Sequence, residues 1–311
     1  MNTETASKRS VKKPMILPVV ICCLLLLLLA FAYWLPSLVM TGKRQTLEEA
    51  LAWQSERYDT SFYADLEKTD YTVAGFEGYE LHVELLKNPS PGAKYVILSH
   101  GYTDNRMGSL KYVRTYLDLG FHCIVYDLRG HGENAPDFTT YGVREGKDLV
   151  CLINDTRERY PDLAVLGLHG ESLGAATTVT ALQYAPAVDF VVADCGFADI
   201  EGVLKEGYRS AHLPTFLVDV ASFTGKLRYH YSLKEMRPID ALDGNAVPIL
   251  FLHGADDRFI LPANSEAMAA RTKGYSEVHL IPGAGHAESV LTAPEDYRAY
   301  VKNFLTRQGF V

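Results

Sequence analysis

The sequence predicts an α/β fold in which a mainly parallel central sheet is covered by helices on both faces. Short apolar runs of strand length recur along the chain, and segments with helical periodicity separate them. These runs are apolar throughout, which is typical of strands that are buried on both faces of a parallel sheet. A length of 311 residues and a hydrophobic content of 48% are enough for one large domain with an extensive core.

The order of the elements follows from the positions of these runs. Strands are predicted at 94–101, 121–127, 163–170, in FVVADCG, at 248–254 and at 277–283. Helices are predicted at 106–119 and 143–159, in AATTVTALQYA and in APEDYRAYVKNFLTRQ. Ahead of the first of these strands, alternating apolar residues around Gly75 and Gly78 predict a β-hairpin.

The alternation breaks between Asp194 and Pro238, where the chain favours helix and is interrupted at Pro214 and Gly225. We therefore expect a small helical cap at about 197–236, inserted over one end of the sheet. The cap is rich in apolar and aromatic side chains that would suit an acyl or aryl group, although ordinary packing also explains them. They are Leu213, Phe216, Leu217, Phe223, Tyr229 and Tyr231.

The N-terminal region contains an uncharged apolar segment from residue 14 to residue 42. A helix that spans a bilayer needs about 20 apolar residues, so this segment is long enough. We expect a short basic cytoplasmic tail at 1–14, a transmembrane signal-anchor at 15–41, a linker with a helical lead-in at 42–70, and the folded domain at 71–311.

Basic residues predict the orientation of this segment in a cell membrane. Four of them precede it and two follow it: Lys8, Arg9, Lys12, Lys13, and then Lys43 and Arg44. The positive-inside rule favours a single-pass protein with its N-terminus inside and its domain outside. Cleavage after the small-x-small sequence Ala30-Phe31-Ala32, followed by secretion, remains open as an alternative.

Charge and cysteine content exclude several classes of function. The net charge is −8 although the N-terminus is basic, so the domain is acidic and is not expected to bind nucleic acid. Cys123, Cys151 and Cys195 lack CxxC or metal-ligand spacing, and we interpret them as small buried residues. We expect no metal and no organic cofactor, and the sequence leaves the oligomeric state open.

Ser172 is the candidate nucleophile, at the centre of the GxSxG sequence Gly170-Glu171-Ser172-Leu173-Gly174. The motif follows an apolar strand and opens a helix of small residues, which is the context of a nucleophile elbow. Glycines on both sides let neighbouring backbone pass close to a strained serine. The alternative is a glycine-rich turn whose serine caps the helix.

His286 is the candidate base, because a serine hydroxyl needs a proton acceptor and this histidine lies in a loop directly after the last predicted strand. The other histidines near strands and loops are weaker candidates: His100, His122, His131, His169 and His253. The acid should follow another strand, and both Asp256 and Asp257 do so after 248–254. A solvated turn or a helix cap is the alternative for these aspartates.

These segments resemble the α/β-hydrolase superfamily, in its serine aminopeptidase-like and monoacylglycerol-lipase-like branch. The resemblance runs from about residue 72 to the C-terminus. It rests on SHGYTDN (99–105), YDLRGHGEN (126–134), GESLG (170–174), HGADDRFI (253–260) and GAGHAES (283–289).

The resemblance implies site residues beyond the nucleophile and the base. In the family the acid segment reads HGxxDxxV, which selects Asp257 here, with Ile260 at the valine position. The backbone N–H groups of Tyr102 and Leu173 would then form the oxyanion hole. DLRGHGEN is expected to be structural.

The resulting expectation is a serine hydrolase that cleaves an ester, thioester or amide of a small-molecule acyl substrate or a peptide through an acyl-enzyme. Two alternatives remain: an acyltransferase with the same Ser-His-Asp triad, and a ligand-binding protein of this fold without catalysis.

Overall fold

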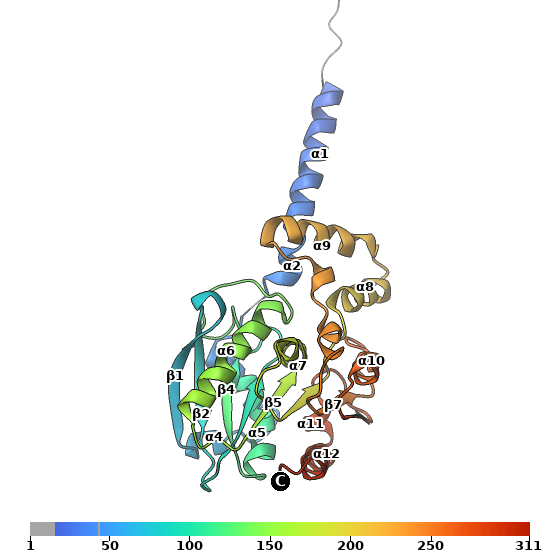
Figure 1. The fold of residues 1–311 in the computed structure, drawn as a ribbon. Coiled ribbons are helices and arrows are strands. Elements are labelled where there is room, and N and C mark those ends of the chain that lie inside the picture. The colour runs from blue at the N-terminus through green and yellow to red at the C-terminus, as the bar shows by residue number, and fades with distance from the viewer. Residues whose placement is uncertain (1–15, 43) are drawn as a thin grey trace, which may run out of the picture.

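The centre of the molecule is an eight-stranded sheet with the strand order β1-β2-β4-β3-β5-β6-β7-β8 (Figure 1). The computed structural model describes residues 16–42 and 44–311, so the expected tail at 1–14 lies outside the described residues. The strands are β1 (Lys68–Ala74), β2 (Glu80–Leu86), β3 (Lys94–Ser99), β4 (Phe121–Tyr126), β5 (Val165–Glu171), β6 (Phe190–Asp194), β7 (Ile249–Gly254) and β8 (Ser276–Ile281). β1 and β2 form the predicted antiparallel hairpin, β2 pairs antiparallel with β4, and all other pairs are parallel.

Helices connect the strands and extend the chain at its N-terminus. The α-helices are α1 (Ile16–Trp34), α2 (Ser37–Met40), α3 (Leu47–Ser55), α4 (Phe62–Asp65), α5 (Leu110–Leu117), α6 (Val143–Arg159), α7 (Leu173–Ala181), α8 (Ile200–Ser210), α9 (Phe216–Tyr229), α10 (Ala263–Arg271), α11 (Ser289–Thr292) and α12 (Pro294–Arg307). Short 3-10 helices lie at Phe76–Gly78, Arg106–Ser109, Leu182–Tyr184, Leu233–Glu235 and Pro238–Leu242.

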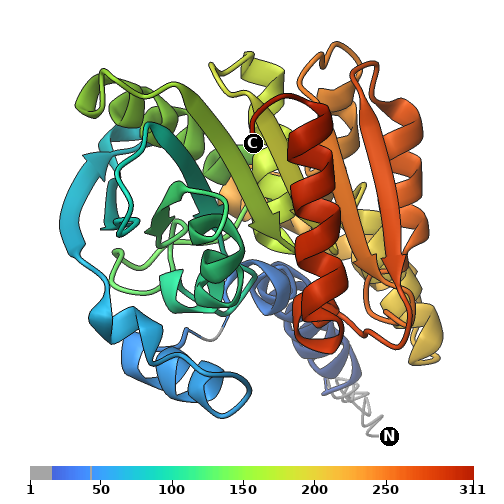
Figure 2. The same cartoon turned by 90° about the horizontal axis from the view of Figure 1, so that it is seen from below.

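Both faces of the sheet are covered, as its apolar strands require. Along β3, Ile97 packs on the side of α6, α7 and α10, whereas Val96 and Leu98 pack on the side of α5 and α12. All three side chains are fully buried. Figure 2 shows α12 running across the second face. The predicted fold class is therefore confirmed; α10, between β7 and β8, is a helix that was not among the predicted elements.

The predicted cap contains α8 and α9, which lie at the end of the domain from which α1 emerges (Figure 1). Pro214 separates the two helices, as predicted, but the expected interruption at Gly225 is wrong because α9 runs through it. A Cβ atom at Gly225 would lie 3.2 Å from the Tyr231 carbonyl oxygen and 3.6 Å from Met40 Sδ. The Tyr231 carbonyl oxygen therefore leaves little room for a side chain at this position.

The apolar N-terminal segment is a helix that continues into the domain. Residues Leu17–Met40 have a mean hydropathy of 2.6, and their length and composition are sufficient for a membrane span. The helix α1 ends at Trp34, and the next residues enter the core, where Leu35 and Met40 are buried. Thr139 N–H donates to the Met40 carbonyl at 2.8 Å, so this end of the segment is part of the domain.

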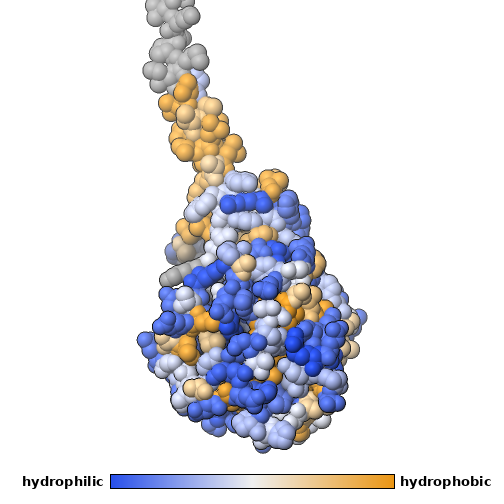
Figure 3. Space-filling model, turned by 90° about the vertical axis from the view of Figure 1, so that its left-hand side faces the viewer, coloured by the Kyte–Doolittle hydropathy of each residue, from blue (hydrophilic) through white to orange (hydrophobic). Residues whose placement is uncertain are grey.

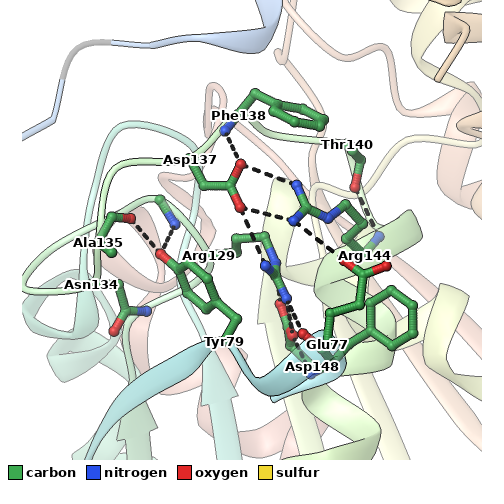
Figure 4. Close-up of polar contacts among 12 residues, drawn as sticks. Glu77, Tyr79, Arg129, Asn134, Ala135, Asp137, Phe138, Thr140, Arg144 and Asp148 are labelled. Atoms are coloured by element: carbon green, nitrogen blue, oxygen red, sulfur yellow. Dashed lines mark hydrogen bonds and ion pairs between the residues drawn. The ribbon is translucent and has the colours of Figure 1, made fainter. Parts of the chain in front are cut away.

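The loop after β4 is held by a buried ionic network (Figure 4). Arg129, which is 2% exposed, donates to both carboxylate oxygens of Asp148 at 2.8 and 2.6 Å and to Asp137 at 3.2 Å. Arg144 pairs with the same Asp137 at 2.9 Å. The network joins α6 to the segment 126–134, which agrees with the structural role expected for DLRGHGEN.

Candidate active site

Ser172 occupies a strained turn between β5 and α7. Its φ of 52° lies in the left-handed region, which costs free energy for a residue with a side chain. A Cβ atom at Gly170 would lie 2.2 Å from the Gly174 carbonyl oxygen, and one at Gly174 would lie 2.0 Å from that of Ser99. Only glycine fits at either position, which is the reason this turn has the sequence GESLG.

His286 reaches Ser172 from the loop after β8. Its Nε2 lies 3.0 Å from Ser172 Oγ, and its Nδ1 lies 2.7 Å from Oδ2 of Asp257. An ionised carboxylate only accepts hydrogen bonds, so Nδ1 carries the proton and donates it to Asp257. Nε2 is then free to accept from the Ser172 hydroxyl. The structure thus brings together the three predicted side chains, from loops after three different strands.

Asp257 is distinguished from Asp256 by burial and by its partners. Asp257 is 2% exposed and accepts from the backbone N–H groups of Phe259 and Ile260 at 2.9 Å each. Asp256 is exposed. Burial alone would raise the pKa of Asp257, but hydrogen bonds from His253 and His286 outweigh it and hold the pKa well below its usual value. Asp257 is therefore ionised throughout the physiological pH range.

His253 is a supporting residue that the sequence did not reveal as a partner of the acid. Its Nε2 lies 3.2 Å from Asp257 Oδ2 and 2.8 Å from the Ile260 carbonyl oxygen, both of which are acceptors. Nε2 therefore carries the proton, and Nδ1 accepts from the Ser265 hydroxyl at 2.7 Å. This side chain fixes the orientation of the carboxylate.

Two adjoining cavities open beside Ser172. The first, of about 430 Å³, contains Ser172 and His286 in its lining, and the second, of about 530 Å³, shares His286 and Glu171 with it. Side chains of mixed character complete the lining of the first cavity: Gln45, Trp53, Tyr102, Thr103, Asp104 and Phe259. Ser172 is therefore reachable by a small molecule, although its own side chain is largely buried.

The cap does not supply the acyl-binding surface that was considered for it. Within the described part of the chain, neither cavity is lined by a residue of α9. Leu213, Phe216 and Phe223 are instead exposed by 50%, 61% and 66%. The physical reason is that α9 packs on α8 and α1 at the outer end of the cap.

Tyr102 lies in the wall of the first cavity, in the loop after β3. Its hydroxyl donates to the Val39 carbonyl at 3.0 Å, so the segment that follows α1 supports this loop. On its other side the ring makes an edge contact with His131, at 5.9 Å between centroids. Leu173 is the first residue of α7, and its amide lies at the positive end of that helix.

A buried ion pair lies beside Ser172. Lys111 of α5 forms an ion pair with Glu171 and donates to the Ala287 carbonyl at 2.9 Å. It thereby joins the residue before Ser172 to the residue after His286. The single hydroxyl hydrogen of Tyr112 lies within reach of both Glu171 and Asp194, and Ser289 donates to Asp194 at 3.1 Å. This role of Lys111 was not predicted, because a single lysine in a helical segment does not indicate a buried ion pair.

The buried carboxyl group of Asp194 is expected to make the stability of the protein depend on pH. Burial, together with the Glu171 carboxylate, raises the pKa of Asp194 to about 6, so the folded state binds a proton that the unfolded chain releases near pH 4. This group's contribution to stability is present below pH 4 and is lost as the pH rises through 6, a difference of about 3 kcal/mol. In Asp194→Asn, we expect the unfolding free energy at pH 4 minus that at pH 7 to fall by about 2 kcal/mol, because at pH 4 this carboxyl is already partly ionised in the unfolded chain. Urea unfolding at the two pH values measures it; an unchanged difference would contradict the assignment.

Among residues 16–42 and 44–311, no cluster of His, Cys, Asp or Glu is arranged as a metal site. Ser172, His286 and Asp257 place a hydroxyl, an imidazole and a carboxylate in hydrogen-bonded sequence.

Comparison with known proteins identifies the family. Residues 96–300 match the sequence profile of the alpha/beta hydrolase family. The uncharacterized protein YqkD of Bacillus subtilis is 31% identical over 280 residues, covering 86% of this chain and 90% of that protein. Alpha/beta hydrolase domain-containing protein 17C of Xenopus tropicalis is 27% identical over 236 residues, covering 70% of this chain but only 64% of the longer relative.

Solved structures share the fold at low sequence identity. The Pyrococcus furiosus esterase Pf2001 superposes with a TM-score of 0.65 at 23% identity, covering 80% of this chain and 96% of that one. Est1E of Butyrivibrio proteoclasticus gives 0.59 at 18% identity, covering 76% and 99%. From the matched sequence profile and the relatives, the chain belongs to the alpha/beta hydrolase family.

Proposed function

We propose that the protein is a serine hydrolase that cleaves an ester, thioester or amide through an acyl-enzyme, with Ser172 as nucleophile, His286 as base and Asp257 as the orienting acid. Membership of the alpha/beta hydrolase family supports a hydrolytic activity. The main support for the roles of these three residues is the hydrogen-bonded sequence from Asp257 through His286 to Ser172, with distances of 2.7 and 3.0 Å.

The mechanism follows from the direction of these hydrogen bonds. Ser172 Oγ attacks the acyl carbon while its proton passes to His286 Nε2, and Asp257 stabilises the resulting imidazolium. The oxyanion would accept from the amides of Tyr102 and Leu173, each worth about 3 kcal/mol of transition-state stabilisation. His286 then protonates the leaving group, and water attacks the acyl-enzyme with the same base to release the acid and restore Ser172.

The shape of the site supports a small acyl substrate. The first cavity measures about 430 Å³, within the range of small-molecule sites, and combines the apolar Trp53 and Phe259 with the polar Asp104. Passing the acyl group to an alcohol instead of water needs the same three residues. Resolving the products formed from an acyl donor, with and without alcohols, separates hydrolysis from transfer.

We also propose that α1 is retained as a membrane anchor, with the N-terminus inside and the domain outside. A cleaved signal peptide is the alternative. Supporting retention, α1 has 19 residues, enough to cross a bilayer, and the apolar segment continues past Ala32 as far as Met40. The polar domain would then be tethered to the cell membrane by one span.

Labelling with a fluorophosphonate probe tests the proposed nucleophile. The full-length protein in detergent should be labelled covalently at Ser172, because the activated hydroxyl attacks phosphorus as it would an acyl carbon. Ser172→Ala should abolish labelling, whereas Ser210→Ala, at an exposed site in α8, should leave it unchanged. In-gel fluorescence with mass spectrometry of the labelled peptide measures both. A folded wild-type protein that resists the probe would favour a binding role.

A further inference from the structure

The cap helix α9 has an exposed apolar face that no part of the described domain covers. Phe216, Phe223 and Leu227 are exposed by 61%, 66% and 60%. They are separated by seven and then four residues, so they lie along one side of the helix, with Val220 between them. Val218, Ala221 and Gly225, on the opposite side, are buried. Single exposed apolar residues are ordinary, but a continuous row marks a contact surface.

The position of α9 is fixed at the end of the apolar helix α1. Arg228 of α9 donates to Ser37 Oγ at 2.7 Å and to the Tyr33 carbonyl at 3.4 Å, and its guanidinium lies 5.3 Å from the Tyr33 ring. Tyr229 Oη lies 3.1 Å from the same Ser37 Oγ. Gly225 lies where the two segments meet, because a Cβ atom there would be in ordinary contact, at 3.6 Å, with both Pro36 and Met40.

The end of α1, where α9 is attached, coincides with the expected edge of a bilayer. The 19 residues of α1 extend roughly 28 Å, close to the hydrocarbon thickness of about 30 Å. Tyr33 and Trp34, at the end of α1, are about half exposed, and such aromatic residues are typical of the membrane–water boundary. Figure 1 shows α9 crossing the chain at the foot of α1, and Figure 3 shows apolar surface at this end of the domain.

We propose that α9 is an in-plane membrane helix, with Phe216, Phe223 and Leu227 inserted among the lipids beside α1. This inference rests on the retained anchor of the proposed function and goes beyond it, because it assigns a second membrane contact. The occupant is the bilayer boundary because the apolar face adjoins α1 at the depth of Tyr33 and Trp34. A helix with Phe and Leu on one side and charged residues such as Asp219 and Lys226 beside them is typical of that location.

A second membrane contact restricts the orientation of the domain more than a single anchor does. A domain held only by α1 could tilt together with that helix, whereas α1 and α9 together define a plane. The cap would then lie flat on the outer surface, and the cavities beside Ser172, which α9 does not line, would have a fixed orientation relative to the lipids.

Tryptophan quenching by brominated lipids tests the depth of α9. The chain has two tryptophans, Trp34 and Trp53. Full-length protein is reconstituted in vesicles of phosphatidylcholine and phosphatidylglycerol with bromine on the acyl chains. In the unaltered chain, quenching of Trp34 reports on the anchor α1. The variant Trp34→Phe retains only Trp53 and gives the contribution of that residue. Phe223→Trp or Leu227→Trp is then introduced into the Trp34→Phe variant, and both of these positions are exposed and tolerate the larger ring.

We expect the added indole at 223 or 227 to be blue-shifted and quenched to a similar extent as Trp34. The matched control is Tyr275→Trp in the same background, an exposed aromatic position before β8 that should stay unquenched. If Trp34 is quenched but the indoles at 223 and 227 are both unquenched, the proposed membrane contact of α9 is wrong. The proposed membrane anchor α1 is then unaffected. If the emission wavelength at these sites changes with the number of protein molecules per vesicle, and bromine does not quench it, the apolar face binds a second copy of the chain. That result would also overturn the membrane contact of α9. Lack of quenching at Trp34 itself would instead remove the anchor on which the inference rests.

Discussion

Replacing Ser172 or His286 with alanine is expected to lower kcat for ester hydrolysis by about 10⁶-fold, and Asp257→Asn to lower it by about 10⁴-fold. The first two changes remove the nucleophile or its base. The third keeps the shape of the side chain but removes the charge that stabilises the imidazolium and fixes its tautomer, through a contact of 2.7 Å. Because the residues act as a unit, Ser172→Ala/His286→Ala should be no slower than either single variant. Steady-state rates with p-nitrophenyl esters of short and medium chains measure these losses.

The neighbouring aspartate provides the control. Asp256→Asn makes the same chemical change one residue away, at an exposed position, and should leave kcat within about twofold of the wild type because surface changes remote from the chemistry have small effects. A large loss in Asp256→Asn with a normal rate in Asp257→Asn would show that the acid is wrongly assigned. Equal losses in both would indicate damage to the loop.

Replacing Arg129 with methionine is expected to reduce the free energy of unfolding by about 3–5 kcal/mol. The change keeps much of the side-chain volume but leaves Asp148, which is fully buried, without its cationic partner. An uncompensated buried carboxylate either remains charged at high cost or takes up a proton. Burial already raises the pKa of Asp148 to about 6 even with Arg129 present. Thermal unfolding of the full chain in one detergent should show a fall in Tm of about 10 °C.

Arg159→Met is the matched control for this prediction. Arg159 also makes two hydrogen bonds to one carboxylate, that of Asp155 at 2.9 Å, but on the solvent-exposed side of α6. An exposed pair of this kind contributes about 0.3–0.5 kcal/mol, so the Tm should fall by about 1 °C. Similar losses in the two variants would contradict the view that burial of the network is what makes Arg129 important.

The sheet could be predicted because its strands are buried on both faces and are therefore apolar throughout. The runs at 94–101, 121–127 and 248–254 match β3, β4 and β7 to within two residues. The helix α10 was harder, because its residues 263–271 are mainly small or polar and only Ser265 and Met268 are buried. The candidate triad could be predicted because each member follows a strand at the same edge of the sheet. The catalytic role of these residues remains a prediction.

The rest of the site depends on contacts between distant segments. Lys111 is joined to Ala287, 176 residues away, and nothing around it in the sequence indicates a buried charge. The contact of His253 with Asp257 depends on the turn that follows β7, and the sequence alone does not define the shape of that turn. The interruption expected at Gly225 is wrong because glycine weakens a helix only modestly, and contacts with α8 and α1 hold α9 through this position.

The contact between Val39 and Tyr102 determines where the chain can be shortened for crystallisation. The hydroxyls of Tyr102 and Tyr141 both donate to the Val39 carbonyl, and Met40 fills the core beside them. A fragment that starts at residue 45 would leave these hydroxyls without their acceptor and expose one wall of the first cavity to water. A fragment that starts at Tyr33 discards nearly all of the apolar helix but keeps this wall, so it is the shorter version that we expect to retain a native site.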